Sequence, residues 1–271
     1  MDTSNDAASG LEAVLSLRGI SKHFGAVSAL TDIDLDVNAG EVVALVGDNG
    51  AGKSTLVKIL AGVHQPSAGE IFFHGQPVTL PDPSAALRLG IATVFQDLAL
   101  CENLDVVANI FLGRELTPFR LDEVSMEIRA WTLLNELSAR IPSVREPVAA
   151  LSGGQRQTVA IARSLLLEPT VILLDEPTAA LGVAQTAEVL DLIDRVRDRG
   201  LGVVMISHNM EDVRAVADRI VVLRLGRNNG IFYPDASNQE LVGAITGASE
   251  NAVTRRANRR AGRAEPGAPN P

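Results

Sequence analysis

Short apolar runs recur along the chain, and each is followed by glycine or polar residues. Segments 41–46, 171–174 and 202–206 are almost entirely apolar, as in parallel strands that are buried on both faces of a sheet. Residues 54–61 follow the first run and place their apolar positions on one side of a helix. Alternating strands and helices predict an α/β sheet with helices on both faces.

The N-terminal part of the chain has a different pattern. Segments 14–20, 31–37 and 70–74 alternate apolar and polar positions, the last less regularly. A period of two predicts antiparallel strands, which we assign to a separate β subdomain. Residues 1–11 are mostly polar and small, and we expect a disordered lead.

The middle of the chain is predicted to be mostly helical from about residue 98 to 150, with breaks at its prolines. These prolines are Pro118, Pro142 and Pro147. We interpret residues of about 97–158 as a helical subdomain, inserted into a domain that covers 12–250. Residues 251–271 are rich in arginine and end in glycine and proline, which predicts a disordered basic tail. Contact of this tail with anionic lipid or a partner is the alternative.

Composition limits the classes of function. The 271 residues are 46% hydrophobic, which is enough for a sizeable core. The formal net charge of -9 argues against a general nucleic-acid binder, and we expect no nucleic-acid partner. Cys101 is the one cysteine, so an intrachain disulfide framework is excluded. No secretory signal or apolar run of ~18 residues is present, so we expect membrane association only through a partner.

A glycine-rich loop follows the first apolar run. Residues 47–54 match the pattern G-x-x-x-x-G-K-S, and Thr55 comes next. Such a loop between a strand and a helix points its backbone N–H groups at phosphate oxygens. Lys53 is expected to reach the β- and γ-phosphates, and the Ser54 hydroxyl to bind Mg²⁺. The predicted phosphate-binding residues are Gly47, Asp48, Asn49, Gly50, Ala51, Gly52, Lys53, Ser54 and Thr55. The alternative is a glycine-rich turn without a ligand.

Two acidic residues end the run at 171–174. Asp175 is expected at the sheet edge where α/β folds bind ligands, and its carboxylate could hold Mg²⁺ opposite Ser54. Glu176 is the next residue and points elsewhere from the same strand end, as suits a general base for an attacking water. An ordinary acidic pair at a strand exit is the alternative.

A further segment, Leu151-Ser-Gly-Gly-Gln155, precedes these residues. Ser152 and Gln155 have the spacing of a capping box, so a helix start without a ligand is the simplest interpretation. A glycine-opened helix N-terminus is also an anion site. Because residues 47–54 already surround the phosphates of this chain, residues 151–155 could instead serve the nucleotide of a second chain.

In this order, residues 47–54, 151–155 and 171–176 resemble the ATP-binding cassette (ABC) ATPases. The resemblance covers about 12–250 and implies a P-loop NTPase core of the RecA-like type that binds ATP and Mg²⁺. It also implies a homodimer that closes on two nucleotides, in which one group of residues from each chain contacts the ATP bound by the partner. That group is Ser152, Gly153, Gly154 and Gln155.

The resemblance gives further residues a role. Gln96 is similar to the Q-loop glutamine that senses Mg²⁺ and the attacking water, and His208 to the switch histidine that contacts the γ-phosphate. Phe24 lies where the family places an aromatic ring on adenine, and a flat face suffices for stacking. Structural roles for His208 and Phe24 are the alternatives. Gly182 replaces the usual aspartate of the D-loop, which puts the coupling between the two sites in question.

The amino-acid sequences of segments 47–59 and 176–186 are similar to those of the ATPases of bacterial simple-sugar importers of the ribose, xylose and fructose type. This similarity implies an integral membrane permease, reached through a groove near 97–113, and an extracytoplasmic solute-binding protein. The subunit is then expected on the cytoplasmic face of the cell membrane. Another small solute, a non-transport ABC ATPase and a regulatory subunit are the alternatives. Retention of Lys53, Glu176 and His208 argues against a catalytically silent subunit.

Overall fold

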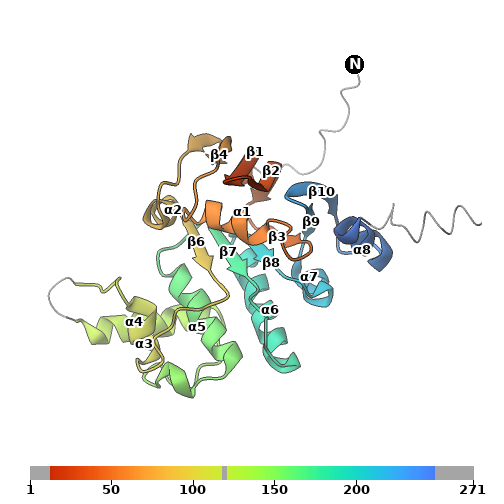
Figure 1. Ribbon diagram of the computed structural model, residues 1–271. Helices are drawn as coiled ribbons and strands as arrows, with labels where there is room; N and C mark the ends of the chain where they lie inside the picture. The colour runs from red at the N-terminus through yellow and green to blue at the C-terminus, as the bar shows by residue number, and fades with distance from the viewer. Residues whose placement is uncertain (1–12, 118–120, 248–271) are drawn as a thin grey trace, which may run out of the picture.

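The computed structural model describes residues 13–117 and 121–247, which form two sheets and the helices around them (Figure 1). One sheet is antiparallel and lies at the N-terminal end of the chain. It contains β1 (Ala13–Phe24), β2 (Val27–Asn38), β4 (Ala68–Phe73) and β5 (Gln76–Val78). Its spatial order is β2-β1-β4-β5. The antiparallel subdomain expected from the alternating segments is therefore confirmed.

The second sheet forms the centre of the molecule. Its strands are β3 (Val42–Val46), β6 (Ile91–Val94), β7 (Val171–Asp175), β8 (Gly202–Ile206), β9 (Arg219–Arg224) and β10 (Arg227–Phe232). The order is β10-β9-β3-β8-β7-β6, and all neighbours are parallel except the final hairpin of β9 and β10. Every residue of β3 and β8 is buried, as the unbroken apolar runs predict for a sheet covered on both faces.

Helices cover both faces of this sheet. The core helices are α1 (Lys53–Leu60), α2 (Pro83–Leu89), α6 (Val183–Asp198), α7 (Met210–Val216) and α8 (Asn238–Thr246). Between β6 and β7 the chain forms α3 (Val106–Phe111), α4 (Glu123–Glu136), the 3-10 helix η1 (Val148–Ala150) and α5 (Gly153–Leu165). Figure 1 shows α3, α4 and α5 grouped at the end of the molecule away from the antiparallel sheet.

Adjacent residues of β3 belong to different hydrophobic clusters. Val42, Ala44 and Val46 pack with residues of α3, α4, α5 and α6. Val43 and Leu45 pack with residues of the antiparallel sheet and α1. Because successive side chains of a strand point to opposite faces, the parallel sheet is the middle layer between these two cores. The loops that follow the carboxyl ends of its strands are therefore attached to a sheet that is packed on both faces.

The segment 98–150 is less helical than its sequence predicts. Its helices α3, α4 and η1 have 6, 14 and 3 residues, and loops connect them. The two chain segments on either side of α3 and α4 are bonded to each other: Val148 donates to the carbonyl of Leu104, and Ala149 to that of Glu102. Of the expected breaks, Pro142 and Pro147 lie in these loops, while Pro118 falls outside the described residues. The bounds of the inserted subdomain, about 97–158, remain a prediction, and so do the disordered ends, which also lie outside the described residues.

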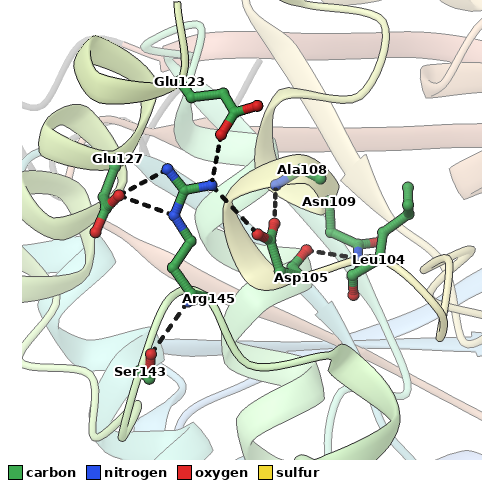
Figure 2. Close-up of polar contacts among 8 residues, drawn as sticks. All are labelled: Leu104, Asp105, Ala108, Asn109, Glu123, Glu127, Ser143 and Arg145. Carbon is green, nitrogen blue, oxygen red and sulfur yellow. Dashed lines mark hydrogen bonds and ion pairs between the residues drawn. The ribbon is translucent and has the colours of Figure 1, made fainter.

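We call residues 101–105 and 143–149 the paired loops, since they are joined by both backbone and side-chain bonds. Arg145 contacts the carboxylates of Glu123 and Glu127 on α4 and that of Asp105, which caps α3 (Figure 2). Asn109 of α3 lies beside them with its amide directed at the loop that precedes the helix. The second of the paired loops leads through η1 directly into residues 151–155.

Candidate active site

The phosphate-loop candidate lies between the buried end of β3 and the start of α1. Gly52 caps α1 with a φ of +105°, and a Cβ there would lie 2.5 Å from the Leu30 side chain. At Gly47, with a φ of +150°, a Cβ would overlap the carbonyl oxygen of Leu223. Both positions therefore require glycine, for backbone conformation and for space. The predicted strand, loop and helix are all present, and α1 begins one residue before its predicted start.

Lys53 is buried at the start of α1. Its ammonium donates to the carbonyl oxygens of Gly47 at 2.6 Å and Asp48 at 3.1 Å. Burial lowers the pKa of Lys53, while Glu176, Asp48 and Asp175 raise it by smaller amounts. The loop thus holds one cation above the N-terminus of a helix, an arrangement that attracts phosphate groups.

A cavity of about 470 Å³ joins this loop to the strand ends, and its volume falls in the usual range for small-molecule sites. The sequence-predicted residues that line it are Phe24, Asn49, Gly50, Ala51, Gly52, Lys53, Ser54, Thr55, Gln96, Asp175 and Glu176. Four further lining residues, Val27, Ser28, Ala29 and Ile206, were not predicted. The alternation that marks β2 as a strand was visible in the sequence, but not which of its residues would meet the loop.

Asp175 is the last residue of β7, Gln96 follows the end of the neighbouring β6 by two residues, and both line the cavity. Burial raises the pKa of Asp175, Glu176 raises it further, and Lys58 and Lys53 oppose the shift. The described residues contain no group of three or more His, Cys, Asp or Glu arranged for a metal ion. The Ser54 hydroxyl, the Gln96 amide and the Asp175 carboxylate nevertheless offer the hard oxygen ligands that suit Mg²⁺, which usually keeps several waters. These side chains fit a magnesium ion that also binds a phosphate.

Glu176 and His208 are in direct contact. The His208 Nδ1 atom lies 2.7 Å from the Glu176 Oε2 atom, and the side chains are 73% and 17% exposed, respectively. Glu176 has a φ of +53°, and its N–H donates to the carbonyl of Ile206 at the end of β8. The sequence predicted both residues but not their contact. A carboxylate held by an imidazole at the mouth of the cavity is a suitable acceptor for a proton from water.

The Phe24 ring is 43% exposed and lies at the edge of the cavity. The Lys22 ammonium lies 5.0 Å from its ring centroid, and His64 meets it edge-on at 5.3 Å. A ring held on one side and open on the other can stack on a nucleobase. Phe24 is therefore not a core residue, which was the structural alternative.

Residues 152–155 do not line this cavity, although all of them are described. They form the predicted capping box of α5: the Gln155 N–H donates to the Ser152 hydroxyl at 3.2 Å, and the Ser152 N–H to the Gln155 side chain at 2.9 Å. A Cβ on Gly153 would lie 2.8 Å from the Leu181 side chain, and one on Gly154 3.1 Å from that of Gln185. The glycines therefore let α5 approach the start of α6.

Gly182 caps the N-terminus of α6 with φ -75° and ψ 162°. A Cβ built there would meet no atom within 4 Å. Neither conformation nor space requires glycine at this position. The missing carboxylate is thus a change of chemistry rather than a consequence of the local fold.

A second cavity, of about 290 Å³, lies between α2, β6 and the inserted helices, and its lining includes Asp97, Leu98, Ala99 and Leu112. Two half-buried arginines also line it. Arg163 donates to the carbonyls of Leu98 and Ala99, and Arg114 to that of Arg163. Burial lowers the pKa of both guanidinium groups. The charged side chains of its lining are these two arginines and Asp97, so the cavity is a groove with a net positive charge.

In the part of the chain that the structure describes, no helix combines the length and the apolar character needed to cross a bilayer. The family model described as ABC transporter matches residues 30–179.

Three proteins illustrate the sequence similarity. The xylose/arabinose import ATP-binding protein XylG of Sulfolobus acidocaldarius is 47% identical over 215 residues, which is 79% of this chain and 86% of that protein. The fructose import ATP-binding protein FrcA of Rhizobium meliloti is 45% identical, covering 88% of this chain and 96% of its own. The ribose import ATP-binding protein RbsA 1 of Rubrobacter xylanophilus is 42% identical, and the match covers 88% of this chain but 48% of that longer protein.

Solved structures give the same fold. CbiO1 from Clostridium perfringens, part of the ABC transporter complex CbiONQ, superposes with a TM-score of 0.73 at 28% identity and covers 93% of this chain and 97% of its own. The dimeric structure of MJ0796, a bacterial ABC transporter cassette, has a TM-score of 0.69 at 26% identity and covers 82% of this chain and 100% of its own. The expected α/β P-loop NTPase fold is confirmed.

Proposed function

The chain belongs to the ABC transporter family of ATP-binding cassettes, and from this premise we propose that it is the ATP-hydrolysing subunit of an importer for a simple sugar. It is an ATPase that binds ATP. The observation that carries the proposed mechanism is the single cavity that joins the phosphate loop, Gln96, Asp175 and Glu176, with His208 at 2.7 Å from Glu176.

The proposed binding roles follow from this cavity. The backbone of residues 47–55 and the Lys53 ammonium hold the phosphates, and the open face of Phe24 holds the adenine. Ser54, Gln96 and Asp175 would hold Mg²⁺, which when bound neutralises charge on the β- and γ-phosphates. Glu176 accepts a proton from the attacking water. His208, already in contact with Glu176, orients that carboxylate and contacts the γ-phosphate.

A second copy of the chain completes the site in this proposal. Ser152, Gly153, Gly154 and Gln155 lie outside the phosphate cavity of their own chain, yet they open a helix N-terminus that suits an anion. A homodimer would place these residues on the ATP of the partner. The dimeric cassette structure with which this chain superposes over 82% of its length supports that arrangement.

The positively charged groove between α2, β6 and the inserted helices is our candidate for the permease contact. It includes Asp97, Leu98 and Ala99 of the segment 97–113. Because Gln96 directly precedes this segment and lines the phosphate cavity, movement of a docked permease helix would displace Gln96 within that cavity. The subunit would then lie on the cytoplasmic face of the membrane, bound through the permease, and an extracytoplasmic solute-binding protein would deliver the sugar.

Sugar is the favoured cargo because the two relatives matched over most of their length are import proteins for xylose or arabinose and for fructose. Amino acids, nucleosides and autoinducers are the alternative solutes. Reconstitution of the subunit with its permease and solute-binding protein would separate them. Stimulation of ATP hydrolysis by pentoses or fructose supports the proposal, whereas stimulation only by an amino acid or nucleoside contradicts it.

Substitution of Glu176 by Gln tests the catalytic assignment. Glu176→Gln removes the proton acceptor but keeps the size of the side chain, so turnover should fall by at least ~100-fold while ATP binding persists. Phosphate release, equilibrium ATP binding and light scattering would measure turnover, affinity and an ATP-trapped dimer. Glu136→Gln is the matched control, because Glu136 is an exposed residue of α4 paired with Arg199. If Glu176→Gln hydrolyses ATP at the wild-type rate, Glu176 is not the base.

A further inference from the structure

A buried carboxylate, Asp212, links the two loops that carry Glu176 and His208. Asp212 lies in the first turn of α7 and is 6% exposed. Its Oδ2 atom accepts a hydrogen bond from the Thr178 hydroxyl at 2.6 Å, and its Oδ1 atom accepts one from the Asn209 amide at 3.0 Å. Thr178 follows Glu176 by two residues, and Asn209 follows His208 directly. One side chain therefore anchors both loops.

The loop that contains Glu176 needs such an anchor, because its backbone is strained. Glu176 and Ala180 have φ values of +53° and +60°, a region that residues other than glycine rarely adopt. A residue in this region persists only where the surrounding structure imposes the conformation. Thr178 lies between these two residues and is itself buried. Its bond to Asp212 ties the middle of this turn to α7, in addition to the contact of Glu176 with His208.

The loop that contains His208 is held by the same residue, Asp212. Asn209 caps α7 by accepting from the Glu211 N–H, and its own N–H donates to the Ser207 hydroxyl. The Asn209 amide also donates to Asp212, which fixes the direction of the residue next to His208. The 2.7 Å contact between His208 and Glu176 thus depends on two loops that are both bonded to Asp212.

Charge pairing does not explain this carboxylate. No ion pair of Asp212 with Lys, Arg or His is found among the described residues, and both of its donors are neutral groups. Its partners are instead two neutral side chains and the N-terminal turn of α7, where a negative charge is favourable. Because its two side-chain donors lie within two positions of Glu176 and His208, this carboxylate is placed to fix the geometry of that pair.

We propose that Asp212 is a positioning residue that holds Glu176 and His208 in contact through Thr178 and Asn209. The inference rests on the proposed role of Glu176 as base. A loss of this tie would release the strained turn and move the Glu176 carboxylate from the attacking water. Misplacement of a catalytic group by about 1 Å can lower a rate by up to 10²-fold. Nucleotide binding would persist, because Asp212 is bonded to Thr178 and Asn209 and not to residues 47–55.

The first experiment compares two substitutions of Thr178. Thr178→Val preserves the shape of the side chain but removes the hydroxyl, whereas Thr178→Ser keeps the hydroxyl. Thr178→Val should lower kcat for ATP by between about 10- and 100-fold with KM within about twofold, and Thr178→Ser should recover most of the loss. Equal kcat values in both variants and the wild type would overturn the proposal.

The second experiment tests whether Asp212 acts through Glu176. Asp212→Ala should lower kcat at least as much as Thr178→Val, and the double variant should lose no more than Asp212→Ala, because both changes break one unit. In a Glu176→Gln background, Asp212→Ala should cause no further loss. A further loss there, or additive losses with Thr178→Val, would show a general structural effect and contradict the inference.

Asp218→Ala is the control for loss of a carboxylate that bonds to a backbone N–H elsewhere in the fold. Asp218 accepts from the Val42 N–H at the opposite end of β3 from the phosphate loop. This variant should lower stability without changing kcat. The two proposals fail in different ways: a fully active Glu176→Gln removes the base assignment itself, whereas an inactive Glu176→Gln with a fully active Asp212→Ala removes the positioning role alone.

Discussion

Substitution of Asn109 by Leu is expected to destabilise the inserted helices, because one buried amide makes most of the side-chain bonds between α3 and the loop before it. Asn109 is 0% exposed. Its Oδ1 atom accepts from the Cys101 N–H at 2.7 Å, and its Nδ2 atom donates to the carbonyls of Cys101, Leu104 and Asp105 at 3.0, 3.2 and 2.9 Å. Figure 2 shows this amide beside Leu104 and Asp105. Leucine has a similar size but none of these bonds.

The magnitude depends on which groups would be left without a partner. Each of the three carbonyls has a second donor: Leu104 N–H for Cys101, Val148 N–H for Leu104, and Asn109 N–H for Asp105. Among residues 13–117 and 121–247, the Asn109 Oδ1 atom is the one acceptor for the Cys101 N–H. One orphaned donor costs about 1–3 kcal/mol, and loss of bonds to carbonyls that remain satisfied costs less than about 1 kcal/mol each. Burial of the leucine side chain offsets part of this. The free energy of unfolding should fall by about 2–4 kcal/mol.

Urea unfolding measures this change, and the chain carries a local probe for it. Trp131, the one tryptophan of the sequence, lies on α4 and packs against the core that contains α3. Its fluorescence reports the inserted helices, while circular dichroism reports the whole fold. A midpoint shift at constant slope gives the loss of stability, and a fluorescence transition ahead of circular dichroism would place the loss in the insertion.

The matched control is Asn135→Leu, the same substitution at an exposed position of α4. It should change the free energy of unfolding by no more than about 0.5 kcal/mol. An equal effect of the two substitutions would refute the reasoning. A loss below about 0.5 kcal/mol in Asn109→Leu would also refute it, since the orphaned Cys101 N–H would then have found water or another acceptor.

Two further predictions concern the candidate site. Burial lowers the pKa of Lys53 in the free protein below the ordinary 10.5. The ammonium therefore loses its proton, and the affinity for ATP declines, at a lower pH than for an exposed lysine. An ATP affinity that stays constant up to pH 10.5 in binding titrations would contradict this. Gly182→Asp should raise the free energy of unfolding by a few tenths of a kcal/mol, because aspartate is a better N-cap than glycine and nothing lies within 4 Å of the new Cβ; a lower melting temperature would count against it.

The parts of the fold that local pattern determines were predictable. The unbroken apolar runs predicted β3, β7 and β8, and the alternating segments predicted β1, β2 and β4. A strand buried on both faces needs apolar residues at every position, and a strand buried on one face needs them at every second position. The capping box at Ser152 was predictable for the same reason, since its partners are three residues apart. The segment 98–150 was not, because its loops are stabilised by pairing with each other rather than by a period in the sequence.

The candidate site divides in the same way. Contiguous motifs located the phosphate loop, Asp175 and Glu176, and the parallel strand order brought them to one edge. The tie between Thr178 and Asp212 spans 34 residues and gave no signal, since no local pattern relates two residues at that separation. The contact of Glu176 with His208, 32 residues apart, was missed as well. Side-chain bonds between distant loops depend on where the sheet places those loops, which the local pattern does not specify.

The position of residues 152–155 connects the fold to the need for a partner. The first turn of a helix leaves backbone N–H groups without an intrahelical acceptor, and in α5 the capping box satisfies only part of them. Gly153 and Gly154 bring this turn against Leu181 and Gln185, next to the turn that begins at Glu176. A ligand bound at the first turn of α5 would therefore lie next to the loop that Thr178 ties to Asp212. In the proposed dimer, a phosphate of the ATP on a second chain would accept from these N–H groups. Its effect would reach Glu176, the proposed base of this chain, through Leu181 and without any side chain at Gly182.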